Sequence, residues 1–246
     1  MKLLYIDCQM GAAGDMLMGA LMELIEDKKG FIDKVNHIGI PGIRIWNETV
    51  VKCGDKGNQV HVIVRSKDGS EEHGHHYTTL TDIHKMIDGL NASEKVKSNA
   101  KAVYDIIAKA ESMVHRKSIE NVHFHEVGAL DAVADVVGTC LLMEMIHADQ
   151  ILISPIHVGS GTVKCAHGIL SVPTPATARI LEGMPIYSGE VKGELCTPTG
   201  AALLKHFGDE FGSMPDMRIE KTGRGMGTKE FPGYTNGLSV TLGYWE

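Results

Sequence analysis

The segment between residues 121 and 147 constrains the fold most, because it places acidic side chains inside an otherwise apolar stretch. The spacing of its apolar residues predicts a helix over 126–147. Asp131 and Asp135 are four residues apart, so they are neighbours on one side of that helix. Burying carboxylates among apolar side chains is costly unless a cation or hydrogen-bond donors compensate them. The segment therefore predicts a helix that carries a functional acidic site.

Imidazole groups gather next to these acids. His123 and His125 are two residues apart, so an extended segment would point both toward one face, with Glu126 following directly. Imidazoles and carboxylates suit divalent ions such as zinc, nickel, iron or manganese. A polar loop over 67–77 supplies a second candidate metal-binding tract, His73, His75 and His76. The competing interpretation is a dipole-complementing glutamate, solvent-facing aspartates and a solvated loop without a ligand.

Composition narrows the class of protein. The chain has 246 residues, 43% hydrophobic and 22% charged, as in ordinary soluble globular proteins. Its formal net charge of -7 argues against a nucleic-acid-binding surface. The five cysteines are scattered without a C-x-x-C pair, so we expect no disulfide framework and a cytoplasmic setting. No stretch long enough to span a bilayer is free of charges, so we expect no membrane association.

The order of the expected elements indicates an α+β fold, with a mixed α/β fold as the alternative. A β-α-β-β opening precedes central helices, and a second half rich in strands and turns follows. A soft boundary near 148–150 divides a helix-rich part, 1–149, from a strand-rich part, 150–246. The patterns predict helices over 15–27, 79–89, 93–115, 176–182 and 198–207, and strands over 2–7, 43–53, 58–66 and 237–244.

Two glycine- or threonine-containing segments are candidate anion sites. Gly11, Gly14 and Asp15 lie between an expected strand and helix, where backbone N–H groups attract phosphate. Thr197 and Thr199 supply hydroxyls at another expected helix start. The alternative for the first segment is a tight turn with Asp15 capping a helix. For the second, an ordinary N-cap followed by proline is equally consistent.

Two further residue groups could carry chemistry. Cys165 and His167 could bind a thiophilic metal or act as nucleophile and base, although such a cysteine is more often a small buried hydrophobe. His167, in a polar turn, is the stronger candidate. Arg224 lies in the sequence GRGMG, interpreted as a glycine-rich loop, where it could hold phosphate or carboxylate. A plain surface turn is the competing interpretation.

Several ordered motifs together resemble the nickel insertase family of nickel-pincer nucleotide biosynthesis, which helps lactate racemase to mature. The resemblance spans nearly the whole chain and rests on IDCQMGAAGDM, the histidine loop, HFHEVGALDAVAD, GSGTVKCAHGILSVPTPAT, ELCTPTGAALL and GRGMG.

That resemblance implies a CTP-dependent cyclometallation, in which nickel enters a pyridinium mononucleotide with two thiocarboxylates. Two nickel–sulfur bonds and one nickel–carbon bond form, so a base must accept the ring proton. The expected substrate-binding residues are Gly11, Gly14, Asp15, Thr197 and Thr199. The expected nickel ligands are His73, His75, His76, His123, His125, Glu126, Asp131 and Asp135. His167 and Glu126 are the candidate catalytic groups.

The resemblance also carries expectations about partners. Full-length family members continue with a C-terminal part associated with CTP and its Mg or Mn ion. We therefore expect this chain to be the N-terminal part, with the C-terminal polypeptide and lactate racemase as partners and a homo-oligomeric state. Two other functions remain open: a nickel storage or carrier module without chemistry, and a metal-dependent hydrolase, which the His/Asp cluster alone would permit.

Overall fold

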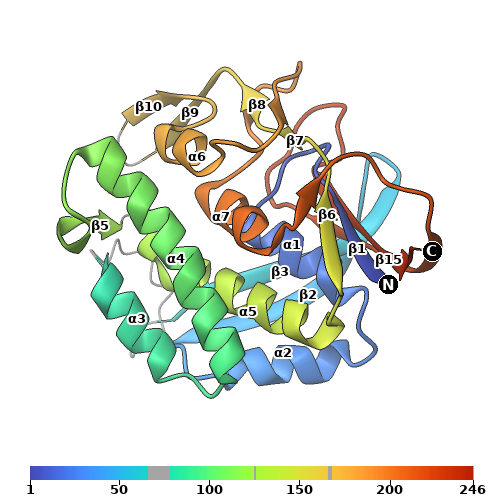
Figure 1. The fold of residues 1–246 in the computed structure, drawn as a ribbon, viewed down its shortest axis with the longest axis horizontal. Helices are drawn as coiled ribbons and strands as arrows, with labels where there is room; N and C mark the ends of the chain where they lie inside the picture. The colour runs from blue at the N-terminus through green and yellow to red at the C-terminus, as the bar shows by residue number, and fades with distance from the viewer. Residues whose placement is uncertain (66–77, 125, 166–167, 246) are drawn as a thin grey trace.

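The computed structural model of the chain describes residues 1–65, 78–124, 126–165 and 168–245. The fold is α+β, as predicted, with helices packed against a mixed seven-stranded sheet (Figure 1). No helix in these ranges is long and apolar enough to cross a membrane.

The large sheet has the strand order β13-β6-β1-β15-β14-β3-β2. Strand β1 is central, pairing in parallel with β6 and antiparallel with β15. Four consecutive residues of β1 are buried, as expected of a strand covered on both faces. The strands are β1 (Lys2–Asp7), β2 (Ile43–Lys52), β3 (Asp55–Val64), β6 (Gln150–Ile153), β13 (Glu210–Phe211), β14 (Arg218–Met226) and β15 (Gly237–Tyr244).

The sheet takes strands from both sides of the boundary expected near 148–150, and the division into two parts stays a prediction. The strands predicted over 43–53 and 58–66 are the antiparallel pair β2 and β3, and the turn between them lies at Cys53 and Gly54, which both have positive φ. Strand β15 matches its predicted range of 237–244.

Seven α-helices lie in the described part of the chain, and α7 begins and ends where the sequence predicts. The predicted helix over 15–27 is shorter than expected, ending at Met22, and a separate helix follows. The helices are α1 (Gly14–Met22), α2 (Lys28–Asn36), α3 (Leu80–Asp88), α4 (Glu94–His115), α5 (Leu130–Ile146), α6 (Pro175–Ile180) and α7 (Pro198–Phe207).

The sequence GRGMG is part of strand β14, so the expectation of a loop there is wrong. Its glycines allow close packing rather than a turn. A Cβ at Gly223 would overlap the carbonyl oxygen of Ala20, and one at Gly225 would overlap that of Met16. Helix α1 therefore lies with its backbone almost directly on β14. Arg224, between the two glycines, pairs with Asp55 at 2.9 Å instead of standing in a free loop.

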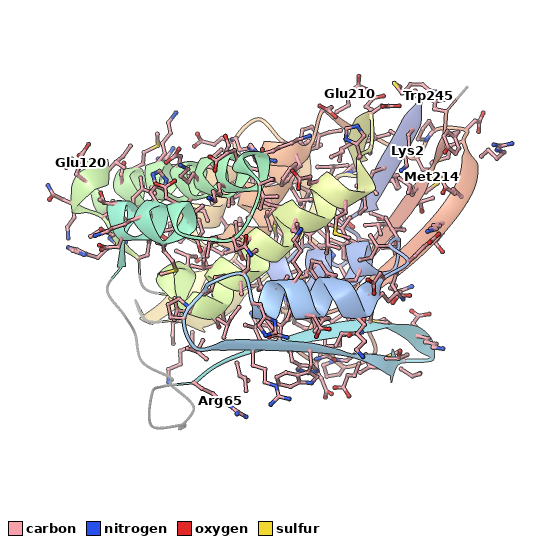
Figure 2. The ribbon with its side chains drawn as sticks, turned by 90° about the horizontal axis from the view of Figure 1, so that it is seen from below. Lys2, Arg65, Glu120, Glu210, Met214 and Trp245 are labelled. Carbon is pink, nitrogen blue, oxygen red and sulfur yellow. The ribbon has the colours of Figure 1, made fainter. Side chains whose placement is uncertain are left out.

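Helix α5 occupies the centre of the helical layer. It packs against α1 on one side and α4 on the other, which explains why its apolar residues run almost all round it. Figure 2 shows α2 lying over the β2–β3 hairpin, with Glu120 at the opposite end of the molecule from Lys2 and Trp245. The remaining short elements are η1 (Ile119–Asn121), β5 (His123–Phe124), η2 (Glu126–Gly128) and β4 (Thr78–Thr79).

Short strand pairs follow β6 and form the upper part of the molecule in Figure 1. The pairs are β9 (Thr162–Cys165) with β10 (Gly168–Ser171), β7 (Ile156–His157) with β11 (Ile186–Tyr187), and β8 (Gly159–Ser160) with β12 (Gly193–Glu194). The β9–β10 pair faces the C-terminal part of α4, and the space between them becomes part of a pocket described below.

Candidate functional site

A tight turn follows β1 and leads into α1. The backbone N–H of Gly11 donates to the carbonyl of Cys8 at 2.9 Å, and Gly11 has a φ of 76°. A Cβ there would overlap the carbonyl oxygen of Leu195. Glycine is therefore required at this position both by conformation and by space.

The segment from Leu195 to Gly200 lies directly against this turn. Ala12 donates its N–H to Leu195 at 3.1 Å and accepts one from Thr197 at 3.0 Å. A Cβ at Gly200 would overlap the carbonyl oxygen of Ala12. The two candidate anion segments are thus brought together, and the starts of α1 and α7 lie side by side.

The turn is also held from the other side by an imidazole. The Nδ1 of His157 is 2.9 Å from the carbonyl oxygen of Gln9, and its ring stacks on Tyr187 with 4.7 Å between centroids. With its hydrogen on Nδ1, the ring donates to that carbonyl oxygen. Nε2 is buried, has no hydrogen-bond partner, and lies against Gly189. His157 therefore anchors the turn without offering Nε2 to a ligand.

Asp135 of α5 reaches the start of α1. A Cβ on Gly14 would be 2.7 Å from Asp135 Cβ and 3.0 Å from its Oδ2, so glycine again permits close approach. The Oδ1 atom of Asp135 is buried and no described group donates a hydrogen bond to it. Asp15, whose Oδ1 accepts from the N–H of Met16 at 2.8 Å, is the acid that faces it.

Both carboxyl groups are shifted toward their neutral forms. Burial raises the pKa of Asp135 well above its usual range, the charges of Asp15 and Asp131 add to the rise, and the backbone N–H of Asp15 opposes it. Burial likewise raises the pKa of Asp15, while nearby backbone N–H groups and the charges of Lys229 and His61 oppose the shift. The charge of Asp15 thus disfavours the charged form of Asp135, and both residues are half-buried.

The other predicted metal ligands are only partly covered by the described residues. His123 is exposed in β5, opposite Thr79, and Asp131 is exposed at the first turn of α5. In the described ranges no three His, Cys, Asp or Glu side chains come together to hold a metal ion. The backbone of Glu126 lies in η2, and its side chain is outside the described part. Also outside it are His73, His75, His76, His125 and His167.

Buried thiols near the turn are poor candidates for metal ligands. Burial raises the pKa of Cys196 to about 12 and that of Cys8 well above its usual range. Metal coordination requires the thiolate, which burial disfavours. Cys165, by contrast, is partly exposed and borders the pocket.

A pocket of about 360 Å³ lies between α4, the β9–β10 pair and the starts of α6 and α7. Its size is at the lower end of the range for small-molecule sites, roughly 300–1,000 Å³. Its walls are mostly apolar, and its polar lining consists of Glu111, His115, Lys164, Cys165, Thr174, Glu194 and Lys229.

Glu194 and Lys229 are the charged pair of this pocket that the sequence did not assign to a role. Lys229 Nζ lies 3.6 Å from Glu194 Oε2, and the hydroxyl of Thr174 donates to Glu194 Oε1 at 3.4 Å. The Glu194 side chain is only 11% exposed, whereas Lys229 is 53% exposed and can turn toward a ligand. Lys229 also acts electrostatically on Asp15, so it links the pocket to the paired acids. Glu194 is the first residue of the motif ELCTPTGAALL, whereas no sequence signal marks Lys229.

Comparison with known proteins matches residues 4–245 to the nickel insertion protein family. The chain belongs to this family. Three relatives named pyridinium-3,5-bisthiocarboxylic acid mononucleotide nickel insertion protein are 38–41% identical to it. The protein of Geobacillus kaustophilus is 38% identical over 99% of this chain and 60% of its own length. That of Acetivibrio thermocellus is 40% identical over 99% and 60%, and that of Clostridium kluyveri 41% over 100% and 63%.

This nickel insertion family member spans about 60% of the length of the curated relatives it matches. No solved structure matches the chain. Family membership agrees with the resemblance of the ordered motifs, and the turn, the paired acids and the pocket all lie within the matched residues.

Proposed function

We propose that this chain binds a pyridinium mononucleotide bearing two thiocarboxylates and takes part in inserting nickel into it. The relatives are named for nickel insertion linked to this mononucleotide. The observation that carries the proposal is the convergence of two helix starts, a buried pair of acids and a mononucleotide-sized pocket.

Each part of the nucleotide has a chemically suitable neighbour. The start of α7 at Pro198 carries the positive end of the helix dipole, which favours the phosphate. Gly11 leaves the turn free of a side chain, and the Thr197 and Thr199 hydroxyls lie beside it. The apolar walls of the pocket suit a flat ring, and Lys229 can neutralise an anionic substituent.

The insertion step replaces a ring C–H bond with a nickel–carbon bond. The electron pair of the C–H bond passes to nickel, two nickel–sulfur bonds form, and the proton must leave to a base. We propose His167 and Glu126 for this role, and His73, His75, His76, His123, His125, Glu126 and Asp131 for handling nickel on the way in. We further propose that CTP with Mg or Mn is consumed and that lactate racemase receives the product.

Lys229→Gln tests the nucleotide site. We expect the dissociation constant of the thiolated mononucleotide to rise roughly tenfold, about 1.4 kcal/mol, because one charge-assisted contact is lost. Lys192→Gln is the matched control, because Lys192 is exposed, lies two residues before Glu194 and does not line the pocket. Isothermal titration calorimetry measures both.

Equilibrium dialysis with nickel separates insertion from a carrier role. Nickel that is retained only when the thiolated mononucleotide is present supports insertion. Nickel bound equally well without the nucleotide contradicts the proposal and favours a carrier.

A further inference from the structure

The paired acids Asp15 and Asp135 each accept a backbone N–H, from Met16 and Asp15 respectively, but neither has a cationic partner among the described residues. In the described residues no lysine, arginine or histidine forms an ion pair with either group. Buried charged groups are normally paired, hydrogen-bonded or bound to a cation. Placing the Asp15 and Asp135 carboxyl groups here therefore costs free energy of folding, and no ion pair among the described residues offsets that cost.

Helix capping does not account for both acids. Asp15 already directs Oδ1 to the N–H of Met16, so the first turn of α1 has its own acceptor. The hydroxyl of Tyr104, which is buried near both α5 aspartates, donates instead to the carbonyl of Val127 at 3.1 Å. Asp135 Oδ1 is left buried without a donor. One acceptor oxygen is thus buried near a second carboxyl group, and no described group donates a hydrogen bond to it.

We propose that Asp15 and Asp135 together form a divalent-cation site, built from one carboxylate of α1 and one of α5, which holds the nickel ion before its transfer. This inference rests on the proposed function and assigns Asp15 to the metal rather than to the phosphate. The phosphate is then assigned to the start of α7, because the Asp135 carboxylate lies against Gly14 and would repel a phosphate at the start of α1.

The small number of ligands suits a site that must release its metal. The described residues supply two carboxylates and no third His, Cys, Asp or Glu ligand. Oxygen ligands bind nickel less strongly than sulfur ligands do, and a two-carboxylate site leaves most coordination positions open. The thiocarboxylates of the substrate can occupy those positions and withdraw the ion. A closed site with four strong ligands would instead trap it.

Manganese is the appropriate probe, because it prefers carboxylates and avoids the histidine tract that would also bind nickel. We expect the full chain to bind one Mn²⁺, measured by the loss of the free-ion signal in electron paramagnetic resonance. Asp135→Asn and Asp15→Asn should each weaken binding at least tenfold. Glu144→Gln is the matched control, because Glu144 is an acid near the other end of α5 that accepts from the Ser93 hydroxyl at 2.6 Å, and the affinity of this variant should stay within about threefold of the wild type.

Circular dichroism and thermal unfolding without metal verify that each variant folds. Wild-type chain that binds no Mn²⁺ at millimolar concentration overturns the inference, as does Asp135→Asn with unchanged affinity. If nickel is nevertheless inserted into the mononucleotide in either case, the proposed function stands and only the position of the metal is wrong. If Mn²⁺ behaves as expected but nucleotide and nickel do not combine, the site stands and the proposed function fails.

Discussion

The two helix starts that lie side by side satisfy their backbone groups in different ways. Helix α7 is capped from within, because the Thr197 hydroxyl accepts from the N–H of Gly200 at 3.1 Å and lies 3.0 Å from the Thr199 hydroxyl. Helix α1 begins after Ala13, which offers no side-chain cap. In place of a local cap, it meets a carboxylate from a different helix, Asp135.

The two neighbouring helix starts therefore differ in role: the start of α7 contributes to stability, and the start of α1 carries the acid pair. A helix start that supplies its own cap needs nothing further, so Thr197 contributes mainly to stability. The start of α1 relies instead on two acids, because the N–H of Asp15 donates to Asp135 and the N–H of Met16 donates to Asp15, so stability there depends on how the two carboxyl groups interact. Substitutions at the two starts should therefore act in opposite directions on stability.

The largest expected effect comes from Gly11→Ala, which breaks the junction between the two starts. The added Cβ overlaps Leu195 and must also adopt a φ of 76°, so we expect a loss of at least about 3 kcal/mol in the free energy of unfolding. Gly183→Ala is the control, since its φ is +86° but nothing lies within 4 Å of the new Cβ. It should lose only about 1–2 kcal/mol. Equal losses in urea unfolding would show that the Leu195 contact is unimportant.

Asp135→Asn should stabilise the metal-free chain by roughly 1–2 kcal/mol at neutral pH, because it removes one of two facing charges. The folded pKa of Asp135 is raised, so the wild type has its full stability at low pH and loses it as the pH rises through that pKa. The gain should therefore shrink toward pH 4. Thermal unfolding across this range measures it, and Glu144→Gln, which keeps an acceptor for the Ser93 hydroxyl, should change stability by less than about 0.5 kcal/mol. A destabilised Asp135→Asn chain would contradict the repulsion.

Thr197→Ala should lower the free energy of unfolding by about 1 kcal/mol, because the N–H of Gly200 loses its acceptor. Thr197→Ser keeps the hydroxyl and should restore most of the loss. Chemical denaturation measures both variants. Identical losses for alanine and serine would mean that the methyl group, rather than the cap, stabilises the helix start.

The sequence predicted those elements of the fold whose ends are marked by residues within the element itself. Helix α7 begins at a Thr-Pro pair and its bounds are recovered, as are those of strand β15. Strand β14 was not predicted, because Gly223 and Gly225 are typical of loops unless one knows that a helix backbone lies against them. That knowledge is tertiary, and local sequence patterns do not contain it.

The candidate site was predictable in its parts but not in its pairing. Asp15 and Asp135 were both singled out, yet for different ligands, because the contact between α1 and α5 joins residues 120 positions apart. The sequence did not indicate Lys229 for the same reason. Its ion pair with Glu194 forms only because the loop after β14 packs beside the pocket in the folded chain. The residue types indicated which ligands could bind, but packing between segments distant in sequence determined which residues lie together in one site.

The bare contact between α1 and β14 has a mechanical consequence. Side chains normally act as a compliant layer between a helix and a sheet, since rotamer changes absorb small displacements. At Gly223 and Gly225 that layer is missing, and main chain rests on main chain. Asp15 is thus carried on a helix with little freedom to slide, which fixes one half of the acid pair to the rigid frame of the molecule.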